Sequence, residues 1–412
     1  MSSKTIVVLG GGVGGQVAAE ALRARLAPEH RIILVDRTLQ QSLAASFPWL
    51  MTGDRRPEAI TKNLRPLARR GVEVREEEIQ AIVTDRQEVK TGAGLLNYDY
   101  LIIALGADLN PAAIPGMQEA AHTFYTLDGA VKLRDALPAF PGGRVVVVVA
   151  ALPFKCPAAP YEAAMLLGDY FRKRGMRDKV EMHIYTPEGL PMPTAGPELG
   201  QAVKEMVESQ GIAFHPQHKL TAVDPAARSL IFDNGATAGY DLLVAIPPHR
   251  GPQVARESGL ANESGWIPVD RATMQTKVGN VYAIGDVTTI PLPGRWKPEV
   301  PLNLPKAGVF AHYQADVVAK RITAGIEGRS AEAVFSGEGS CMLEMGHGKA
   351  GFASGHFYAT PYPQVKMYAP GQAWHWGKVL FEQWWLAEGI KRGLLRLLLS
   401  ASGRAMGAPV TL

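Results

Sequence analysis

The sequence predicts an α/β protein in which one unit of parallel sheet and helices occurs twice, with the second copy inserted into the first. Three observations predict this arrangement. A glycine-rich turn follows the first strand, the similar segments YDYLIIALG (98–106) and YDLLVAIPP (240–248) take matching positions in the two halves, and residues 326–412 differ in composition. The matching segments indicate an internal duplication.

The N-terminal turn has the pattern of a dinucleotide site. Gly10, Gly12 and Gly15 form the motif G-x-G-x-x-G, and Asp36 follows about 20 residues later. Gly10 allows the tight turn, Gly12 lets the backbone approach a pyrophosphate, and Gly15 lets the helix pack on the strand. Asp36 is expected to bind a ribose hydroxyl. The expected elements are a strand over 5–9, a helix that ends near 26 and a strand over 31–36.

The rest of the first unit is expected to return to this turn by way of an antiparallel hairpin. Its last strand ends at Ala104, Leu105, Gly106 and Ala107, beside the nucleotide. The expected elements in between are a loop over 38–56, a helix over 57–70, a strand over 72–79 and a hairpin over 79–97.

The second unit repeats the plan but loses the glycines of its turn. Residues 145–162 read VVVVVAALPFKCPAAPYE, so a buried strand leads into Lys155 and Cys156 where phosphates would lie in a nucleotide site. Glu162 falls in the first turn of the helix that follows. The expected elements are helices over 159–174 and 197–210, and strands over 180–187 and 240–246.

The segment GNVYAIGDV (279–287) is expected to be a strand that ends at Gly285 and Asp286, where a carboxylate suits the polyol linker of a flavin. Lys306 precedes the next helix and is placed to stabilise negative charge at the pyrimidine end of a reduced flavin, although a solvated lysine fits the sequence nearly as well. The residues expected to bind FAD are Gly10, Gly12, Gly14, Gly15, Asp36, Arg37, Ile79, Ala104, Gly106, Gly285, Asp286, Lys306 and Gly308.

These patterns divide the 412 residues into three parts. Residues 1–110 and 246–325 are expected to form the FAD-binding domain. Residues 111–245 are expected to form a second Rossmann-like domain with a degenerate nucleotide site that contains Cys156. Residues 326–412 are expected to form a C-terminal part with a cysteine strand and amphipathic membrane-docking helices.

Composition and charge exclude several classes of function. The net charge is +4 and no basic block occurs, so nucleic acid is not an expected partner, and no metal site is expected. No signal peptide and no run long enough to span a membrane is evident. The two cysteines, Cys156 and Cys341, do not form a disulfide scaffold, and they are either a redox pair or two unrelated buried thiols.

The tail combines aromatic and basic residues. Four of the seven tryptophans lie at 374, 376, 384 and 385. Such a pattern in short helices is typical of an interfacial anchor, and a core or dimer-interface helix pair is the alternative. The basic residues among them are Lys378, Lys391, Arg392, Arg396 and Arg404.

Together these motifs resemble the flavoproteins with two dinucleotide-binding domains. Within that group, FKCP (154–157), PYE (160–162), NLPKAGVFA (303–311) and SCMLEMGHGKAGF (340–352) resemble sulfide:quinone oxidoreductase and the flavoprotein of flavocytochrome c sulfide dehydrogenase. The resemblance covers nearly the whole chain, and its two cysteine segments are its most specific part.

Three features favour the quinone-linked branch: the absence of a leader, the absence of a cysteine near residue 40 for covalent FAD, and Phe47, Pro48 and Trp49. The resemblance then implies non-covalent FAD and a peripheral, monotopic position on the cytoplasmic membrane. A third cysteine that many relatives carry is missing from residues 112–128, which leaves the sulfur release route open. The oligomeric state stays open too, a homo-oligomer included.

The resemblance also implies a mechanism. Sulfide is oxidised to polysulfide or elemental sulfur by Cys156 and Cys341, with Cys341 as the thiolate facing FAD and Cys156 as the persulfide carrier. A helix N-terminus and Lys155 would instead lower the pKa of Cys156 and make it the better leaving thiol. Glu162 is the candidate acid or base, unless it only caps its helix. The residues expected to contact the quinone are Phe357, Phe381 and Trp385, and core packing is the alternative role for each of them.

Three other functions fit parts of the sequence. A type II NADH:quinone oxidoreductase shares the fold but needs the second glycine fingerprint that residues 150–160 lack. A flavocytochrome c-type sulfide dehydrogenase would pass electrons to a cytochrome. A degenerate flavoprotein would act only as a binding or sensor protein.

Overall fold

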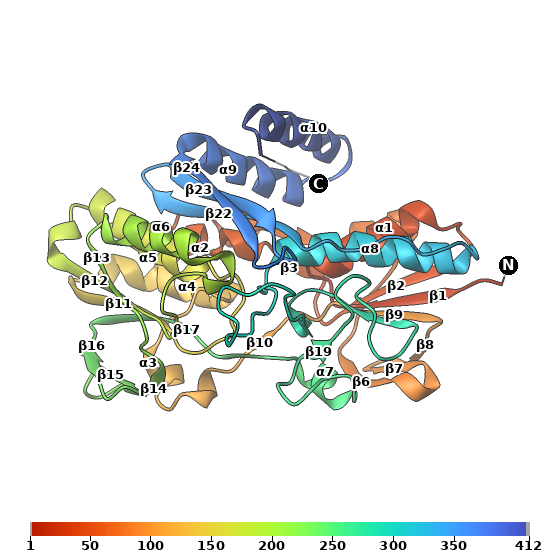
Figure 1. Cartoon of the computed structure of the whole chain (residues 1–412), viewed down its shortest axis with the longest axis horizontal. Helices are drawn as coiled ribbons and strands as arrows, with labels where there is room; N and C mark the ends of the chain where they lie inside the picture. The colour runs from red at the N-terminus through yellow and green to blue at the C-terminus, as the bar shows by residue number, and fades with distance from the viewer. Residues whose placement is uncertain (1, 409–412) are drawn as a thin grey trace.

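The structure is a computed structural model and describes residues 2–408. Its first domain contains a five-stranded parallel sheet in the order β20-β9-β1-β2-β5. Helices α1 and α8 lie side by side along this sheet (Figure 1). The buried strand residues are almost entirely aliphatic, as expected of a parallel sheet that is covered on both faces. The elements are β1 (Thr5–Leu9), α1 (Val13–Arg25), β2 (Arg31–Asp36), β5 (Glu73–Glu76), β9 (Tyr100–Ile103), β20 (Val281–Ala283) and α8 (Gly308–Ile326).

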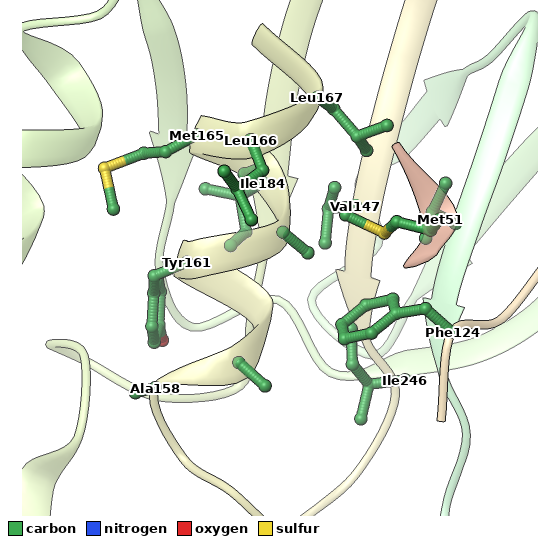
Figure 2. Packing of buried hydrophobic residues seen from close by; sticks show 14 of the residues in the cluster. Met51, Phe124, Val147, Ala158, Tyr161, Met165, Leu166, Leu167, Ile184 and Ile246 are labelled. Carbon is green, nitrogen blue, oxygen red and sulfur yellow. The ribbon is translucent and has the colours of Figure 1, made fainter. Parts of the chain in front are cut away.

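The second domain repeats this pattern with a four-stranded parallel sheet in the order β13-β12-β11-β17. Val145 to Val149 of β11 are completely buried. Leu166 and Leu167 of α5 pack toward the sheet, and Met51 of the first domain reaches Val147 and Phe124 in the same core (Figure 2). The elements are α4 (Leu127–Ala136), β11 (Gly143–Val149), α5 (Ala159–Lys173), β12 (Val180–Tyr185), α6 (Pro197–Glu208), β13 (Ile212–His215) and β17 (Leu242–Ile246).

Each domain also carries a three-stranded antiparallel sheet at the equivalent place in its chain order. The two crossings between the domains pair with each other, because β10 and β18 are antiparallel partners, with Leu109 opposite His249. The elements are β6 (Ile79–Val83), β7 (Glu88–Thr91), β8 (Gly94–Asn97), β10 (Asp108–Leu109), β14 (Leu220–Asp224), β15 (Ser229–Phe232), β16 (Thr237–Gly239) and β18 (His249–Arg250).

The C-terminal part covers both domains from one side (Figure 1). Strand β22 packs against α5 of the second domain and α8 of the first. Its core includes Phe352 stacked on Trp374 with ring centroids 4.5 Å apart. The elements are β22 (Glu338–Gly346), β23 (Lys349–His356), β24 (Gln364–Gly371), α9 (Gln372–Leu386) and α10 (Gly389–Ala405).

The expected helix over 57–70 is wrong. A short strand, Thr61–Asn63 (β4), pairs there with Gln40–Ser42 (β3), and 3₁₀ turns that begin at Pro57 and beside Pro66 flank it. Proline lacks the amide hydrogen that a continuous helix needs, and this explains the break. The expected loop over 38–56 contains β3 and the helix α2 (Phe47–Met51). The remaining short elements are α3 (Met117–Ala120), α7 (Gln253–Glu257), β19 (Ile267–Pro268) and β21 (Thr288–Thr289).

The expected interfacial anchor divides into two different helices. In α9, Trp374, Trp384 and Trp385 are buried, and only Trp376 is largely exposed, at 65%. Most of these tryptophans therefore serve the core. Helix α10 instead exposes an apolar stripe with a helical spacing of four, three and one residues, formed by Ile390, Leu394, Leu397 and Leu398.

The Phe352 side chain is expected to hold α9 on the C-terminal sheet. Phe352→Ala removes the ring beneath Trp374 and leaves a cavity, so it should lower the free energy of unfolding by about 3–5 kcal/mol. Urea titration followed by tryptophan fluorescence measures the change. Leu95→Ala is the control, because Leu95 is 58% exposed. Equal stability of the two variants would contradict this packing role.

Candidate functional site

In the glycine turn after β1, a side chain at Gly10 or Gly15 would clash with the backbone. Gly10 has a φ of +97°, and a Cβ there would lie 2.4 Å from the carbonyl oxygen of Ala104. A Cβ on Gly15 would lie 1.8 Å from the carbonyl oxygen of Gly10. These contacts place the first turn of α1 directly against the strand ends, as a dinucleotide turn requires.

Gly12 lies differently, because a Cβ there would meet no protein atom within 4 Å. It is the N-cap of α1 and has no side-chain cap, so the first amide groups of the helix stay available for an anion. The Gly11 N–H donates to Asp36 Oδ2 over 2.5 Å. Helix α8 begins at Gly308, whose Cβ would lie 3.5 Å from Val13 Cγ2, so the two helices start beside each other.

Asp286 follows β20 and has a buried Oδ1 without a hydrogen-bond partner among the described residues. Burial raises the pKa of Asp286, and the charges of Lys155 and Lys306 oppose that shift. A buried acceptor of this kind needs a donor, and the hydroxyl groups of a flavin polyol supply one. Gly285 has a φ of +71°, and its N–H donates to Gln314 over 2.7 Å. These residues fit FAD.

Lys306 is buried and fixed. Its Nζ donates to the carbonyl oxygens of Asp286 and Thr288 over 2.7 and 2.9 Å, and it lies 3.4 Å from the ring centroid of Trp266. Burial lowers the pKa of Lys306 to about 8. The carbonyl oxygen of Lys306 accepts a hydrogen bond from the Cys156 N–H over 2.7 Å. The alternative interpretation, in which the Lys306 side chain is solvated, is therefore wrong.

The loop between β11 and α5 holds Cys156 in a left-handed conformation, with a φ of +55°. Such a backbone is uncommon for a residue other than glycine and is found at functional sites. Cys341 lies in β22, opposite Ala353 of β23. Both cysteines are free thiols, both are partly buried, and both pack against the same core cluster as Tyr161 and Leu343.

The prediction that Cys156 has a low pKa is wrong. Burial raises the pKa of Cys156, and the nearby charges of Cys341 and Glu162 raise it further. Burial also raises the pKa of Cys341, to about 11, a smaller shift than that of Cys156. Removal of a thiolate from water outweighs the helix terminus that the sequence suggested.

Glu162 does not cap its helix. Ala158 is the N-cap of α5, and the Glu162 carboxylate accepts a hydrogen bond from the Lys378 ammonium of α9. Lys378 is only 6% exposed, so the expectation that it belongs to a basic surface of the tail is wrong. Its ammonium also lies 4.7 Å from the ring centroid of Trp49. This ion pair joins the cysteine loop, α2 and the C-terminal part.

The aromatic residues expected at a quinone lie in different surroundings. Phe357 is 8% exposed and packs on Phe310 of α8 with centroids 5.1 Å apart. Trp385 is 3% exposed, with the ammonium of Lys62 4.0 Å from its ring centroid, whereas Phe381 is partly exposed. A cavity of about 560 Å³ is lined by none of these three residues, and its lining includes Tyr313, Ser340, Ser354, His356, Trp296 and Tyr362.

Two of the residues expected to bind FAD lie at the margin of this site. Arg37 is exposed just after β2, and Ile79 begins β6. Gly14 lies inside α1, where a Cβ would be 3.0 Å from Ile284, and Gly106 follows β9 with a φ of +68°. Individual FAD contacts therefore stay predictions.

Sequence reasoning missed a second group of residues around the cysteine loop. The Tyr125 hydroxyl donates to the Lys155 carbonyl oxygen over 3.0 Å, and His249 packs against the Tyr125 ring with centroids 5.4 Å apart. Burial lowers the pKa of His249 to about 3, so its imidazole is neutral. Isolated Tyr and His residues carry no motif, and only the paired crossings β10 and β18 bring His249 here.

Two buried polar side chains lie where the sequence predicts a degenerate second nucleotide site. The Tyr161 hydroxyl donates to Glu188, and both side chains are buried. Glu188 follows β12, where an acidic residue would bind a nucleotide ribose in an intact site. Burial raises its pKa to about 7. The Glu188 carboxylate and the Tyr161 ring are therefore part of the packed interior at this strand end.

Comparisons with known proteins agree with this geometry. Residues 4–308 match the family model described as pyridine nucleotide-disulphide oxidoreductase. The chain belongs to this family. It is 29% identical over 408 residues to the sulfide-quinone reductase of Aquifex aeolicus, which covers 93% of this chain and 90% of that relative. The X-ray structure of the Aquifex sulfide:quinone oxidoreductase matches with a TM-score of 0.83 at 27% identity and covers 96% of this chain and 95% of that one.

The mitochondrial sulfide:quinone oxidoreductase of mouse is 27% identical over 299 residues, which cover 69% of this chain and 66% of that relative. With this family, the expected α/β fold with two Rossmann-like domains is confirmed. The protein is an FAD-dependent oxidoreductase. Within residues 2–408, no helix has the length and apolarity needed to cross a membrane.

Gly12→Ala is expected to lower FAD content without unfolding the protein. The new methyl group meets no protein atom but occupies the place of pyrophosphate contact, so the FAD bound after purification should fall roughly tenfold. Flavin absorbance per protein measures the loss. Gly189→Ala is the matched control, because a Cβ there also meets no protein atom. Wild-type FAD content in Gly12→Ala would contradict the assignment.

Proposed function

We propose that this protein is a sulfide:quinone oxidoreductase that oxidises sulfide through Cys156 and Cys341 and passes the electrons by way of FAD to a quinone. The observation that carries this proposal is the position of the Cys156 loop: its N–H binds the Lys306 carbonyl, at the start of the FAD-side helix α8. Cys341 packs in the same core cluster, and the relatives named for sulfide and quinone cover most of the chain.

The two sulfurs would act as a reversible bridge. Hydrosulfide attacks the bridge at Cys156, a new sulfur–sulfur bond forms there, the Cys156–Cys341 bond breaks, and Cys341 leaves as a thiolate with the electron pair. Attack at Cys156 makes Cys341 the leaving group, because the sulfur that is not attacked departs with the electron pair. The Cys156 persulfide then bonds to the Cys341 sulfur and restores a bridge that is one sulfur longer, and the two electrons released would go to FAD, which supplies two-electron redox chemistry when it is bound. Successive rounds lengthen the sulfur chain to polysulfide or elemental sulfur.

Two charged residues would support this chemistry. Lys306 holds a positive charge near the FAD site and favours the accumulation of negative charge there. Glu162 accepts the proton that the incoming sulfur loses, because its carboxylate interacts with both cysteines. Burial raises the pKa of Glu162, which makes its carboxylate a stronger base than an exposed one.

The quinone would bind on the side of the site closed by the C-terminal part. We keep Phe357, Phe381 and Trp385 as the proposed contacts. The cavity of about 560 Å³ has the size of a small-molecule site and is lined by Ser340, the neighbour of Cys341.

Helix α10 would dock the protein on the membrane that holds the quinone, and we propose a peripheral position on the cytoplasmic membrane. Its exposed stripe has Ile390 at 93%, Leu397 at 68% and Leu394 at 59% exposure. Lys391 and Arg396 are exposed beside the stripe and suit anionic lipid headgroups. Arg392 instead binds Glu20 of α1 over 2.9 Å and fixes the helix to the first domain.

Cys156→Ala and Cys341→Ala are each expected to abolish reduction of FAD by sulfide, because the bridge cannot form with one sulfur. Both variants should keep FAD and should still be reduced by dithionite, which is the control for an intact flavin site. Anaerobic stopped-flow absorbance measures the rates. Near wild-type quinone reduction by either variant would exclude the mechanism. Rapid reduction by NADH would instead favour the nicotinamide-linked function.

Vesicle flotation tests the docking helix. The triple variant Ile390→Asp, Leu394→Asp, Leu397→Asp should lower the lipid-bound fraction at least about tenfold, because three apolar side chains lose their burial in lipid. The control carries aspartate at Leu95, Ile231 and Val334, which are also exposed but lie on other elements. A wild-type protein that stays with the soluble fraction would contradict membrane docking and favour a soluble acceptor.

A further inference from the structure

A cluster of four titratable side chains lies behind the two cysteines. Glu162 comes from α5, Glu344 from β22, and His375 and Lys378 from α9. Glu162, Glu344 and Lys378 are 3%, 1% and 6% exposed. The charge of Glu162 acts on both cysteines, and the charge of Lys378 opposes it. Glu162 therefore couples the sulfur site to the other three residues of the cluster.

The cluster forms a chain of contacts. The Lys378 ammonium donates to Glu162, and the backbone of Glu344 donates to the same carboxylate. His375 Nδ1 lies 2.9 Å from Glu344 Oε2, within hydrogen-bond distance. The other oxygen, Glu344 Oε1, is buried and has no hydrogen-bond partner in the described part of the chain.

One end of this chain reaches the surface. The His375 side chain is 21% exposed, and Trp376 beside it is 65% exposed. The edge of Trp49 packs on the His375 ring with centroids 6.0 Å apart, and Trp49 also covers Lys378. His375 therefore connects the buried carboxylates to solvent.

The charges leave room for one additional proton. Two carboxylates face a single ammonium, and the next charged group along α9, Glu382, already forms an ion pair at 2.8 Å with Arg55 of the first domain. Burial alone would lower the pKa of Lys378, but the charges of Glu162 and Glu344 outweigh it and raise the pKa. Lys378 therefore stays protonated while a carboxylate takes up the proton.

We propose that Glu344 and His375 form a proton outlet that carries the proton released at the sulfur site from Glu162 to solvent. This inference rests on the proposed function. Hydrosulfide attack on the Cys156–Cys341 bridge gives a Cys156 persulfide and a Cys341 thiolate, which holds the electron pair. The persulfide then loses its proton to Glu162. That proton moves to the free oxygen of Glu344, then through the His375 imidazole to water, and Lys378 keeps its charge throughout.

The outlet is tested in single turnovers with the full-length holoenzyme. Sulfide is mixed without quinone in weakly buffered solution, and FAD absorbance and a pH-indicator dye are followed together. His375→Gln keeps a hydrogen-bond donor toward Glu344 but cannot relay a proton. It should slow proton release and FAD reduction by about tenfold or more, with an enlarged solvent isotope effect. Added imidazole should restore both rates.

Two further variants sharpen the test. His347→Gln is the matched control, because exposed His347 also faces a buried carboxylate, Asp169, at 3.9 Å, and it should behave as wild type. Glu344→Gln should be slow and should not recover with imidazole, since it interrupts the chain before the histidine. His375→Ala replaces His375→Gln if that variant does not fold, and imidazole should rescue it in the same way.

The other results decide against the outlet. Wild-type rates in His375→Gln overturn it. A slow His375→Gln that imidazole does not restore assigns His375 a structural role only, and also overturns it. A wild-type protein whose FAD is not reduced by sulfide overturns the proposed function, and the outlet with it.

Discussion

The hydrogen bond from the Cys156 N–H to the Lys306 carbonyl oxygen is the contact on which the rest of the site depends. It joins a loop of the second domain to the segment that opens α8 of the first. In this position the backbone of Cys156 is left-handed. The hydrogen bond from the Tyr125 hydroxyl and the buried start of α5 stabilise the loop in this conformation. Strain of this kind persists only where surrounding structure enforces it. The sulfur is therefore placed by two domains together.

The C-terminal part completes the site from the opposite side. Strand β22 supplies Cys341 and Glu344, and α9 supplies Lys378 and His375. The first domain contributes as well, because Ser46 and Arg55 both bind Glu382 of α9, at 2.6 and 2.8 Å. Removing one partner of such a buried pair is costly, since it leaves an uncompensated charge. Closure of the site and folding of the tail are consequently linked.

The degenerate nucleotide site of the second domain explains how one duplicated unit came to hold two chemistries. Gly10, Gly12 and Gly15 keep the first turn open to a pyrophosphate, whereas the second turn is filled by the Cys156 loop. Tyr161 and Glu188 bind each other, and both side chains are buried. Both domains keep a parallel sheet, of five strands in the first and four in the second, because both retain aliphatic buried strands. The difference lies in the loops at the strand ends.

Strong local patterns explain what could be predicted. The aliphatic strands, the glycine turn and the helices α1, α5, α6 and α8 follow from periodicity and turn chemistry within short windows. The prediction of a helix over 57–70 was wrong because strand pairing between β3 and β4 is not a local property. The prediction of a lowered pKa for Cys156 was also wrong, because burial depends on everything that packs around the sulfur.

The sequence by itself determined the two Rossmann-like units, the flavin turn and the presence of a cysteine, Cys156, in place of the second glycine turn. Tertiary structure alone decided that Lys378, 216 residues beyond Glu162, is its ion-pair partner, and that most tail tryptophans are core rather than surface. The physical reason is range. Backbone propensity and turn geometry act over a few residues, whereas burial and charge pairing are set by whichever distant segments the packed fold brings together.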